Sequence, residues 1–200
     1  MLERCIAQAR LEDDPLEHQV FEGEEATGLT ACGLDWKEIQ FVKCRFMGCD
    51  FSRASFYSVR FTDCDFSNCL FLQTYWKDTA LEGCKGEGGN FSQARFLRCR
   101  FTGSSLRYGN FSKSVWESCS IQDCSFREAF FPEAKLKKLK LCGTDFTRTD
   151  FFKTPLKGLD MGECILDGIQ VSDTFHELQG MRISPIQAIS LAQLLGVEIR

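Results

Sequence analysis

Large apolar residues recur at every fifth position of this sequence. Between residues 36 and 171, each position whose number ends in 1 or 6 holds Phe, Trp, Leu, Ile, Met or Val, and Gly86 is the only exception. A helix has a period of about 3.6 residues and a strand a period of about two, so neither brings such positions to one face. An unbroken period of five therefore indicates a repeat architecture.

A second set of positions, two residues before each large one, holds mostly Cys, Ala, Ser, Thr and Gly. The other three positions of each quintet are mostly polar, so each quintet offers one large and one small inward side chain. This suits one side of a square coil, in which four quintets close a turn of about 20 residues and turns stack about 4.8 Å apart. No quintet can bury its own large residue, so stacking of turns makes the core of this all-β solenoid.

Residues 20 positions apart are expected to lie above one another in this coil. The tryptophans then share one side, and a ladder of phenylalanines forms another. At Gly86, where the large residue is missing, we expect a local void or bend. The predicted core ladder comprises Trp36, Phe51, Phe71, Trp76, Phe91, Phe111, Trp116, Phe131 and Phe151.

The cysteines follow the same frame. Nine of the 12 occupy the small inward position, where Cys acts as a small apolar residue. Side chains of stacked residues such as Cys44 and Cys64 run parallel, which is poor geometry for a disulfide. A reduced core fits a cytoplasmic location. Residues 1–10 do not resemble a signal peptide, and no stretch is long and apolar enough for a membrane helix.

The sequence divides into three parts. Residues 1–35, with nine acidic and two basic residues, are predicted to form an N-terminal cap and an imperfect first coil. Residues 36–175 carry 17 acidic and 20 basic residues and are expected to form about seven coils. Residues 176–200 are expected to form a C-terminal helix and tail, with Ser184 as N-cap and Gln187 completing a capping box.

The C-terminal helix is apolar enough that something must cover it. It either plugs the end of its own coil or packs against the same helix of a second copy. The candidate interface residues are Ile186, Ile189, Leu191, Ala192, Leu194 and Leu195.

Two outward features on the coil are candidate partner contacts. One is apolar and is either a protein contact or covered by an end segment. The other is basic and is either a solvated face or a contact for nucleic acid or an acidic protein. Because the sequence pI is about 5.3, we expect no strong direct binding of nucleic acid. The residues are Leu70, Leu72, Phe130 and Phe152 in the apolar set, and Lys135, Lys137, Lys138 and Lys140 in the basic set.

No catalytic constellation is visible in the sequence. His18 and His176 lie near opposite ends, and a narrow filled coil offers no cleft in which either could activate a nucleophile. Cysteines spaced by five, without paired CxxC motifs, do not suggest zinc. We therefore expect a protein that is not an enzyme and uses no cofactor or metal.

Several quintets resemble the A/C-D/N-L/F-x-x signature of pentapeptide-repeat proteins. Examples are residues 44–48 (Cys-Arg-Phe-Met-Gly), 64–68 (Cys-Asp-Phe-Ser-Asn) and 94–98 (Ala-Arg-Phe-Leu-Arg). This resemblance implies a right-handed quadrilateral β-helix. The layout is also similar to the Qnr-type quinolone-resistance proteins, through residues 156–160 and the ending 184–199. Because no loop interrupts the frame, the chain resembles the members of that branch that lack loops.

The Qnr-type resemblance implies a partner and an assembly. The partner would be a type II topoisomerase, DNA gyrase or topoisomerase IV, bound by mimicry of duplex DNA and protected from fluoroquinolones. The assembly would be a homodimer through the C-terminal helix. Two other hypotheses remain open, namely a scaffolding solenoid with a different partner and weak nucleic-acid binding through the lysine cluster. Acidic residues gather near the N-terminus and not along the coil, which favours the scaffold over simple mimicry.

Overall fold

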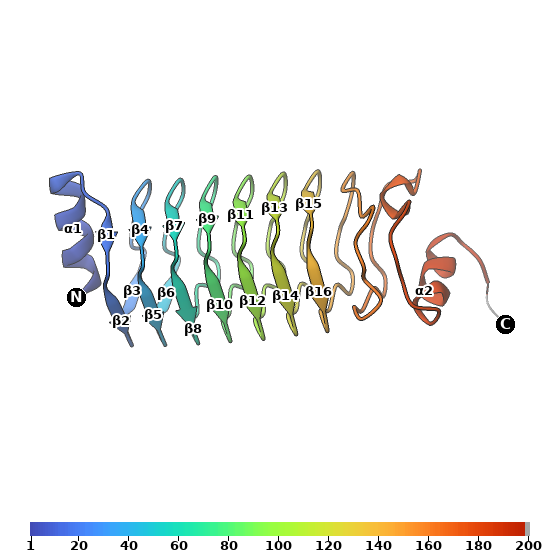
Figure 1. Ribbon diagram of the computed structural model, residues 1–200, viewed down its shortest axis with the longest axis horizontal. Coiled ribbons are helices and arrows are strands. Elements are labelled where there is room, and N and C mark those ends of the chain that lie inside the picture. Colours follow the sequence, from blue (N-terminus) through green and yellow to red (C-terminus); the bar gives the residue numbers. More distant parts are fainter. Residues whose placement is uncertain (199–200) are drawn as a thin grey trace.

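The chain forms a rod of stacked turns with a helix at each end (Figure 1). A computed structural model describes residues 1–198, so Ile199, which ends the apolar C-terminal run, lies outside the described residues. Helix α1 (Leu2–Glu12) covers the first turn, and α2 (Gln187–Leu194) lies at the other end, after the 3-10 helix η1 (His176–Leu178). The predicted quadrilateral β-helix with a short C-terminal helix is confirmed.

The strands are short and pair in parallel at a spacing of 20 residues, as in Trp36 beside Phe56. We name the four sides A to D in chain order; side D has only turns and isolated bridges. Side A contains β1 (Leu16–Glu17), β4 (Asp35–Lys37), β7 (Ser55–Tyr57), β9 (Tyr75–Lys77), β11 (Arg95–Leu97), β13 (Val115–Glu117) and β15 (Lys135–Lys137). Side B contains β2 (Val20–Glu22), β5 (Gln40–Val42), β8 (Arg60–Thr62), β10 (Ala80–Glu82), β12 (Arg100–Thr102), β14 (Ser120–Gln122) and β16 (Lys140–Cys142), and side C contains β3 (Glu25–Thr27) and β6 (Arg45–Met47).

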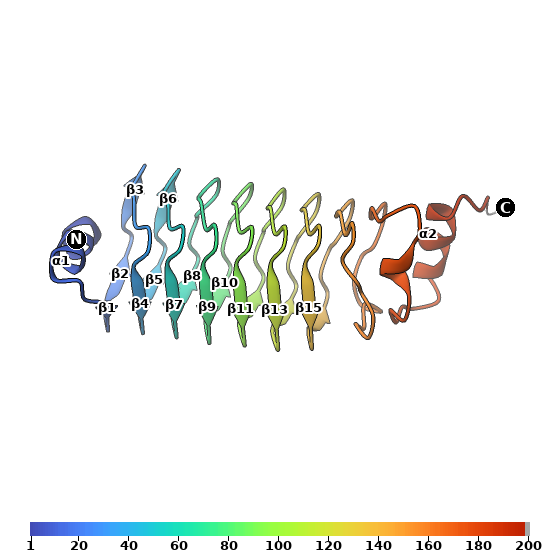
Figure 2. The same ribbon diagram turned by 90° about the horizontal axis from the view of Figure 1, so that it is seen from above.

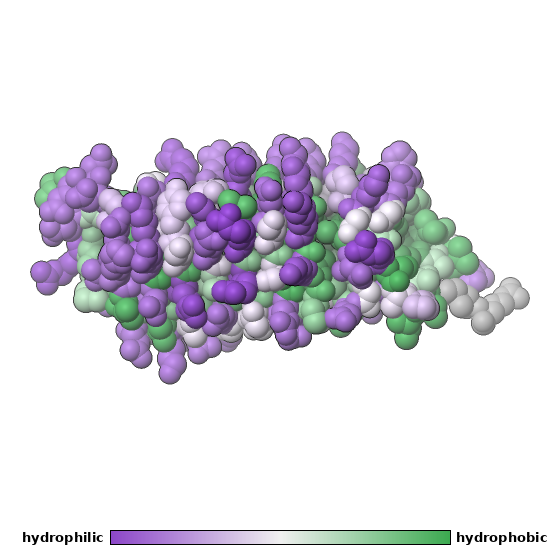
Figure 3. All heavy atoms as spheres, in the orientation of Figure 1, coloured by the Kyte–Doolittle hydropathy of each residue, from purple (hydrophilic) through white to green (hydrophobic). Residues whose placement is uncertain are grey.

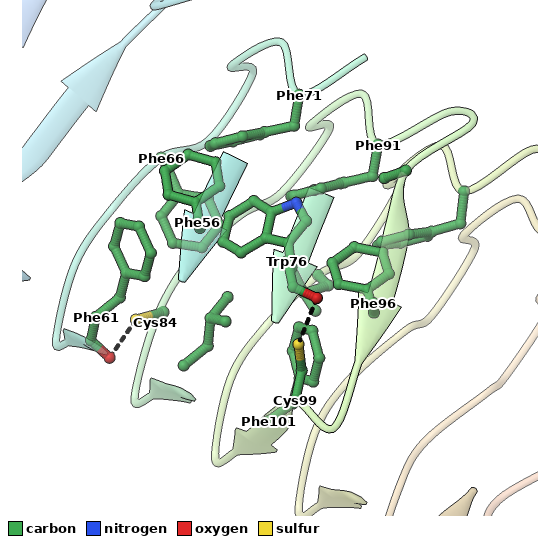
Figure 4. Close-up of a cluster of buried hydrophobic side chains, with 14 of the residues drawn as sticks. Phe56, Phe61, Phe66, Phe71, Trp76, Cys84, Phe91, Phe96, Cys99 and Phe101 are labelled. Carbon is green, nitrogen blue, oxygen red and sulfur yellow. Dashed lines mark hydrogen bonds between the residues drawn. The ribbon is translucent and has the colours of Figure 1, made fainter. Parts of the chain in front are cut away.

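The large inward residues stack in columns through the rod (Figure 4). On side D the rings of Phe71 and Phe91 are 4.8 Å apart and nearly parallel. On side A the rings of Phe56 and Trp76 are 4.2 Å apart. All nine residues of the predicted core ladder are at most 3% exposed. Burial of one such ring contributes about 1.5–3 kcal/mol.

The small inward positions also supply hydrogen-bond donors. The thiol of Cys84 donates to the carbonyl oxygen of Phe61 at 3.4 Å, and the thiol of Cys99 donates to that of Trp76 at 3.5 Å (Figure 4). The hydroxyl of Thr149 donates to the carbonyl oxygen of Phe126 at 2.8 Å in the same relation, 23 residues back. Treating Cys as merely apolar therefore overlooked one of its roles, because thiols such as those of Cys84 and Cys99 also donate to buried main-chain acceptors.

At some positions an Asp or Asn just before a large residue favours a turn. On side D, Asn90 accepts a hydrogen bond from the backbone N–H of Ser92 at 3.0 Å, and on side C Asp65 accepts one from Ser67 at 3.0 Å. These are Asx turns, which compete with extended strand geometry. Side C is a strand at Arg45 and a turn one coil later, at Asp65, and it is again a turn at Lys85, where no Asx side chain stands.

Residues 16–35 make a complete first turn. Leu16, Phe21, Ala26 and Ala31 are all buried, and β1, β2 and β3 pair with the next turn. The carboxylate of Glu24, which stands at a small inward position, accepts a hydrogen bond from the backbone N–H of Leu2 at 3.3 Å. Helix α1 buries three apolar residues, so it covers the open end of the coil (Figure 2). Such a cover shields the unpaired edge of the first strands.

Gly86 is neither a void nor a bend, contrary to the sequence-based expectation. A side-chain Cβ at this position would lie 2.5 Å from Cε2 of Phe66 and 2.7 Å from Cδ2 of Leu106. The residues above and below therefore fill the space, and glycine is the residue that leaves room for them.

We predict that Gly86→Leu, which would restore the period, destabilises the protein by about 1–3 kcal/mol because it overpacks the site. In a Phe66→Leu background the same change should cost less, since the ring that occupies the space is gone. Urea unfolding of the four members of this double-mutant cycle measures the coupling. A Gly86→Leu variant more stable than the wild type would contradict the packing described here.

A second prediction concerns alkaline pH. Burial raises the pKa of the Cys124 and Cys164 thiols to about 11, above the ordinary value of 9.0. The unfolded chain therefore loses these protons first, and the free energy of unfolding should fall between about pH 9 and 11 by roughly 1 kcal/mol per pH unit and thiol. Chemical denaturation across this pH range measures the fall. In the control Cys124→Ser/Cys164→Ser, the free energy of unfolding should fall less steeply with pH. Equal slopes in both proteins would refute it.

Candidate interaction surfaces

The two histidines cannot belong to one site. His18 lies in the first turn, where its Nδ1 is 3.1 Å from the carboxylate of Glu38, and His176 begins η1 at the far end (Figure 1). Among residues 1–198 no group of three His, Cys, Asp or Glu side chains could hold a metal ion. The outer surfaces of the rod are therefore the candidate functional regions.

The apolar candidates on side D do not form one patch. Leu70, Phe130 and Phe152 are 43%, 48% and 41% exposed, and Leu72 is half-buried. Phe130 bridges to Asp150, so Phe130 and Phe152 lie on adjacent turns. Leu70 is three turns away from Phe130, about 14 Å at the spacing of parallel strands. The structure thus separates a leucine pair from a phenylalanine pair.

Phe152 of this pair borders a hollow of about 420 Å³. Its lining includes Phe152, Pro155, Ser172 and His176. The ammonium of Lys153 lies 5.0 Å from the centre of the Phe152 ring, a cation–π contact. This hollow lies where the regular coil ends.

The basic candidates line one corner of the rod. Lys135 and Lys137 lie on β15, Lys140 lies on β16, and Lys138 lies at the corner between sides A and B; all four are exposed. Arg95 of β11 and Arg100 of β12 lie two turns away from these lysines, with β13 and β14 between them. The corner has a hollow of about 560 Å³, lined by Asp78, Arg98, Arg100, Ser118, Ser120, Lys138 and Lys140, among others.

Helix α2 exposes part of its apolar surface. Ile186, Ile189 and Leu195 are 76%, 50% and 54% exposed. Leu191 and Leu194 pack against the core, and Ala192 is half-buried. Green, apolar side chains accordingly gather near the C-terminal end in Figure 3, whereas the coil body is mostly purple. The candidate interface residues therefore divide between docking the helix and facing outward.

Gln187 docks the helix on the coil. Its side-chain amide donates to the carbonyl oxygens of Met161 and Cys164 at 2.7 and 2.6 Å, and its Oε1 accepts from the backbone N–H of Ser184 at 2.7 Å. The last bond is half of the predicted capping box, but the helix begins at Gln187 with Ile186 and not Ser184 as its N-cap. The other two had no signal in the sequence, because they depend on carbonyl groups left free where the coil ends.

Glu177 is a second docking residue that the sequence did not reveal. It is 3% exposed, and its carboxylate accepts hydrogen bonds from the backbone N–H of Lys153 at 2.7 Å and the hydroxyl of Ser172 at 2.9 Å. Despite its burial, these bonds hold its pKa below the usual range. The carboxylate thereby caps an N–H that another turn would otherwise pair.

Comparison with protein families gives two matches that together extend over residues 38–168. The model described as "Pentapeptide repeat region" matches residues 54–131, and that described as "Pentapeptide repeats (8 copies)" matches residues 38–68 and 131–168. The chain is a pentapeptide-repeat protein.

One solved structure shares the fold, and two solved pentapeptide-repeat proteins give weaker matches. A trypsin-treated variant of QnrB1, a plasmid-mediated fluoroquinolone resistance protein, is 22% identical; the match covers 93% of this chain and 99% of that one, with a TM-score of 0.51. HetL, involved in heterocyst differentiation regulation in the cyanobacterium Nostoc, is 13% identical over 88% of this chain and 90% of its own, with a TM-score of 0.29. A thylakoid-lumen pentapeptide-repeat protein of Arabidopsis thaliana is 21% identical over 56% and 67%, with a TM-score of 0.28.

A search of curated proteins finds none that matches this pentapeptide-repeat protein. Within residues 1–198, neither α1 nor α2 has the length and apolar character that crossing a bilayer requires.

Proposed function

We propose that this pentapeptide-repeat protein binds a type II topoisomerase, DNA gyrase or topoisomerase IV, and lessens its poisoning by fluoroquinolones. It would act as a binding protein of the cytoplasm and not as an enzyme. The fold shared with QnrB1 along nearly the whole chain is compatible with this role. The observation that carries the proposal is the acidic N-terminal end of the rod.

The acidic side chains of this end point into solvent. Glu12, Asp13, Asp14, Glu22 and Glu25 are all exposed, on α1 and on the first turn. A surface that binds DNA carries positive charge for the phosphates, and a cluster of carboxylates on a rod can occupy the same surface. The mimicry we propose is confined to this end, since the turns beyond it carry a small excess of basic residues.

The second part of the proposal is a homodimer through α2. The outward residues Ile186, Ile189 and Leu195 are apolar and lie at the tip of the rod. In a two-fold arrangement the same patch on each copy would cover the other. The two acidic ends would then lie at the far tips of a longer rod.

A structural scaffold is the alternative function. The excess of basic over acidic residues between 36 and 175 favours a partner other than a DNA-binding enzyme, because a long mimic of DNA would be acidic throughout. In that case the coil would present partner contacts without any effect on topoisomerase activity.

A supercoiling assay with DNA gyrase and a fluoroquinolone tests the topoisomerase proposal. Titration of this protein should restore supercoiling, and Glu22→Lys/Glu25→Lys should raise the concentration required about tenfold, because rim charges mainly affect association. Glu133→Lys, an exposed change on side D, is the matched control. If the protein inhibits supercoiling and does not restore it in the presence of the drug, it binds the enzyme without protecting it. If it changes supercoiling neither with nor without the drug, the scaffold function is favoured.

Light scattering tests the dimer. We expect the wild type to have twice the mass of one chain and Ile186→Glu/Ile189→Glu to be a monomer, because two buried carboxylates would be unpaired in the interface. Gln193→Glu, an exposed change on the same helix, should leave the mass unchanged. If the wild type is a monomer, or if the double variant is still a dimer, α2 is not a dimer interface.

A further inference from the structure

Ladder hydrogen bonds join successive turns on sides A and B as far as β15 and β16, where they stop. The backbone N–H of Ser118 donates to Lys137 at 3.0 Å, and that of Asp123 donates to Cys142 at 3.0 Å. The next members of these two series are Lys138 and Gly143, and neither N–H donates to a backbone carbonyl among the described residues. Both sheets therefore end here, although the chain continues.

Pro155 is a physical cause of this interruption. The N–H of Val115 donates to Ala94, and that of Lys135 donates to Ser114, each at 2.9 Å. Position 155 is next in this series, and proline has no N–H to donate to Ala134. After this point the backbone N–H groups of Leu156 and Met161 donate to Glu177 and Arg182, in the segment that precedes α2.

The same two turns stay joined on the other two sides. On side C the N–H of Phe146 donates to Ile165 at 2.9 Å, and on side D the N–H of Phe151 donates to Gln170 at 2.8 Å. Main-chain hydrogen bonds therefore join these two turns on sides C and D and not on sides A and B. We call this opening, between residues 135–143 and 155–163, the seam.

Inward leucines are partly exposed at the seam. Leu136, Leu139 and Leu141 are half-buried, whereas Trp116 and Ile121, one turn earlier, are 0% and 3% exposed. A cleft of about 400 Å³ lies here, lined by Leu139, Lys140, Leu141, Asp160, Glu163 and Arg182. Its volume is within the range of pockets that hold a drug-sized ligand, so it has room for a few residues of extended chain.

The wall of the seam that residues 135–143 form carries four lysines and no carboxylate, whereas the far wall carries Asp160 and Glu163. Lys140 lines both this cleft and the corner hollow, which also contains Lys138 and Arg100. These three cations form no ion pair with the described carboxylates, whereas Arg182 on the far wall pairs with Asp160 at 3.3 Å. Charge therefore favours an anionic ligand that approaches along the β16 wall.

We propose that the seam binds an extended, acidic segment of a partner protein, which adds a strand to the open edge of β16. Main-chain groups of such a segment would pair with the free edge, alternate apolar side chains would cover Leu139 and Leu141, and carboxylates would face Lys138 and Lys140. This is β-strand addition, in which main-chain bonds supply affinity and side chains supply specificity.

Two observations select this occupant. Lysines beside an open strand repel the same edge of a second copy, so the seam disfavours self-association and favours a partner of opposite charge. A nucleic acid could contact the lysines, but it has no use for an open strand edge or for exposed leucines. Strand addition at the seam requires no particular protein as the partner and is independent of topoisomerase binding.

A direct test uses fluorescence anisotropy with a labelled ten-residue peptide that alternates Glu and Val. The full-length protein should bind it, and Lys138→Glu/Lys140→Glu should weaken binding at least about tenfold through charge repulsion. Lys113→Glu, an exposed change on side D, should leave binding unchanged. No binding of the Glu/Val peptide at low salt overturns the proposal.

Pro155→Ser separates strand addition from simple charge attraction. The restored N–H should let the turns pair, slow amide exchange at Lys138 and Gly143, and weaken peptide binding at least about tenfold without any change of charge. Unchanged peptide binding in a variant with protected amides would overturn the proposal.

Two further ligands keep the test decisive if Pro155→Ser does not close the seam. A peptide that alternates Glu and Pro keeps the carboxylates but lacks half of the main-chain donors, so it should bind at least about tenfold more weakly. A single-stranded oligonucleotide should not compete with the Glu/Val peptide. Equal binding of the proline peptide, or displacement by the oligonucleotide, would show a merely basic surface and refute strand addition.

Discussion

Stacking of equivalent residues in successive turns is the interaction on which the rest of this molecule depends. Parallel pairing sets each residue beside the one 20 positions away, and rings such as Phe91 and Phe111 lie 4.9 Å apart in the same column. An inward side chain is therefore packed by its own turn and the turns next to it. Trp76, for example, contacts Phe96 in its own column and Phe71 on side D. Stability is then close to a sum of contacts between adjacent turns, so a defect such as an overfilled position affects its neighbours and not the whole rod.

This constraint separates folding from function along the chain. Two positions of each quintet supply the core and its internal hydrogen bonds, while three face outward and are free to vary in charge and size. The acidic first turn and the basic turn of β15 and β16 are built on the same backbone. Recognition by this protein accordingly depends on outward positions, on which the fold places few demands.

Much of the fold could be predicted from the sequence, because the period of five reports directly on which side chains point inward. The columns of Trp and Phe follow from that frame. The frame does not report on hydrogen bonds, so it missed the thiol of Cys99 as a donor to Trp76 and the Asx turn at Asn90. It also gave the wrong expectation for Gly86, since a gap in the pattern does not show that neighbours such as Phe66 fill it. The candidate surfaces were predictable as residue types only, because grouping Phe130 with Phe152 and not with Leu70 requires the number of turns between them.

The surfaces that offer most groups for binding lie where the repeat is interrupted. Inside a regular solenoid every main-chain group is paired and every large residue is covered, so nothing is left to bind except outward side chains. At the C-terminal end, Gln187 and Glu177 satisfy main-chain groups that another turn would have paired. At the seam, Pro155 removes one donor and no side chain among residues 1–198 replaces it. Strand edges and leucines therefore remain open beside lysines that form no ion pair within those residues. The five-residue repeat builds the rod, and where it is interrupted, main-chain groups and apolar side chains are left for a partner to bind.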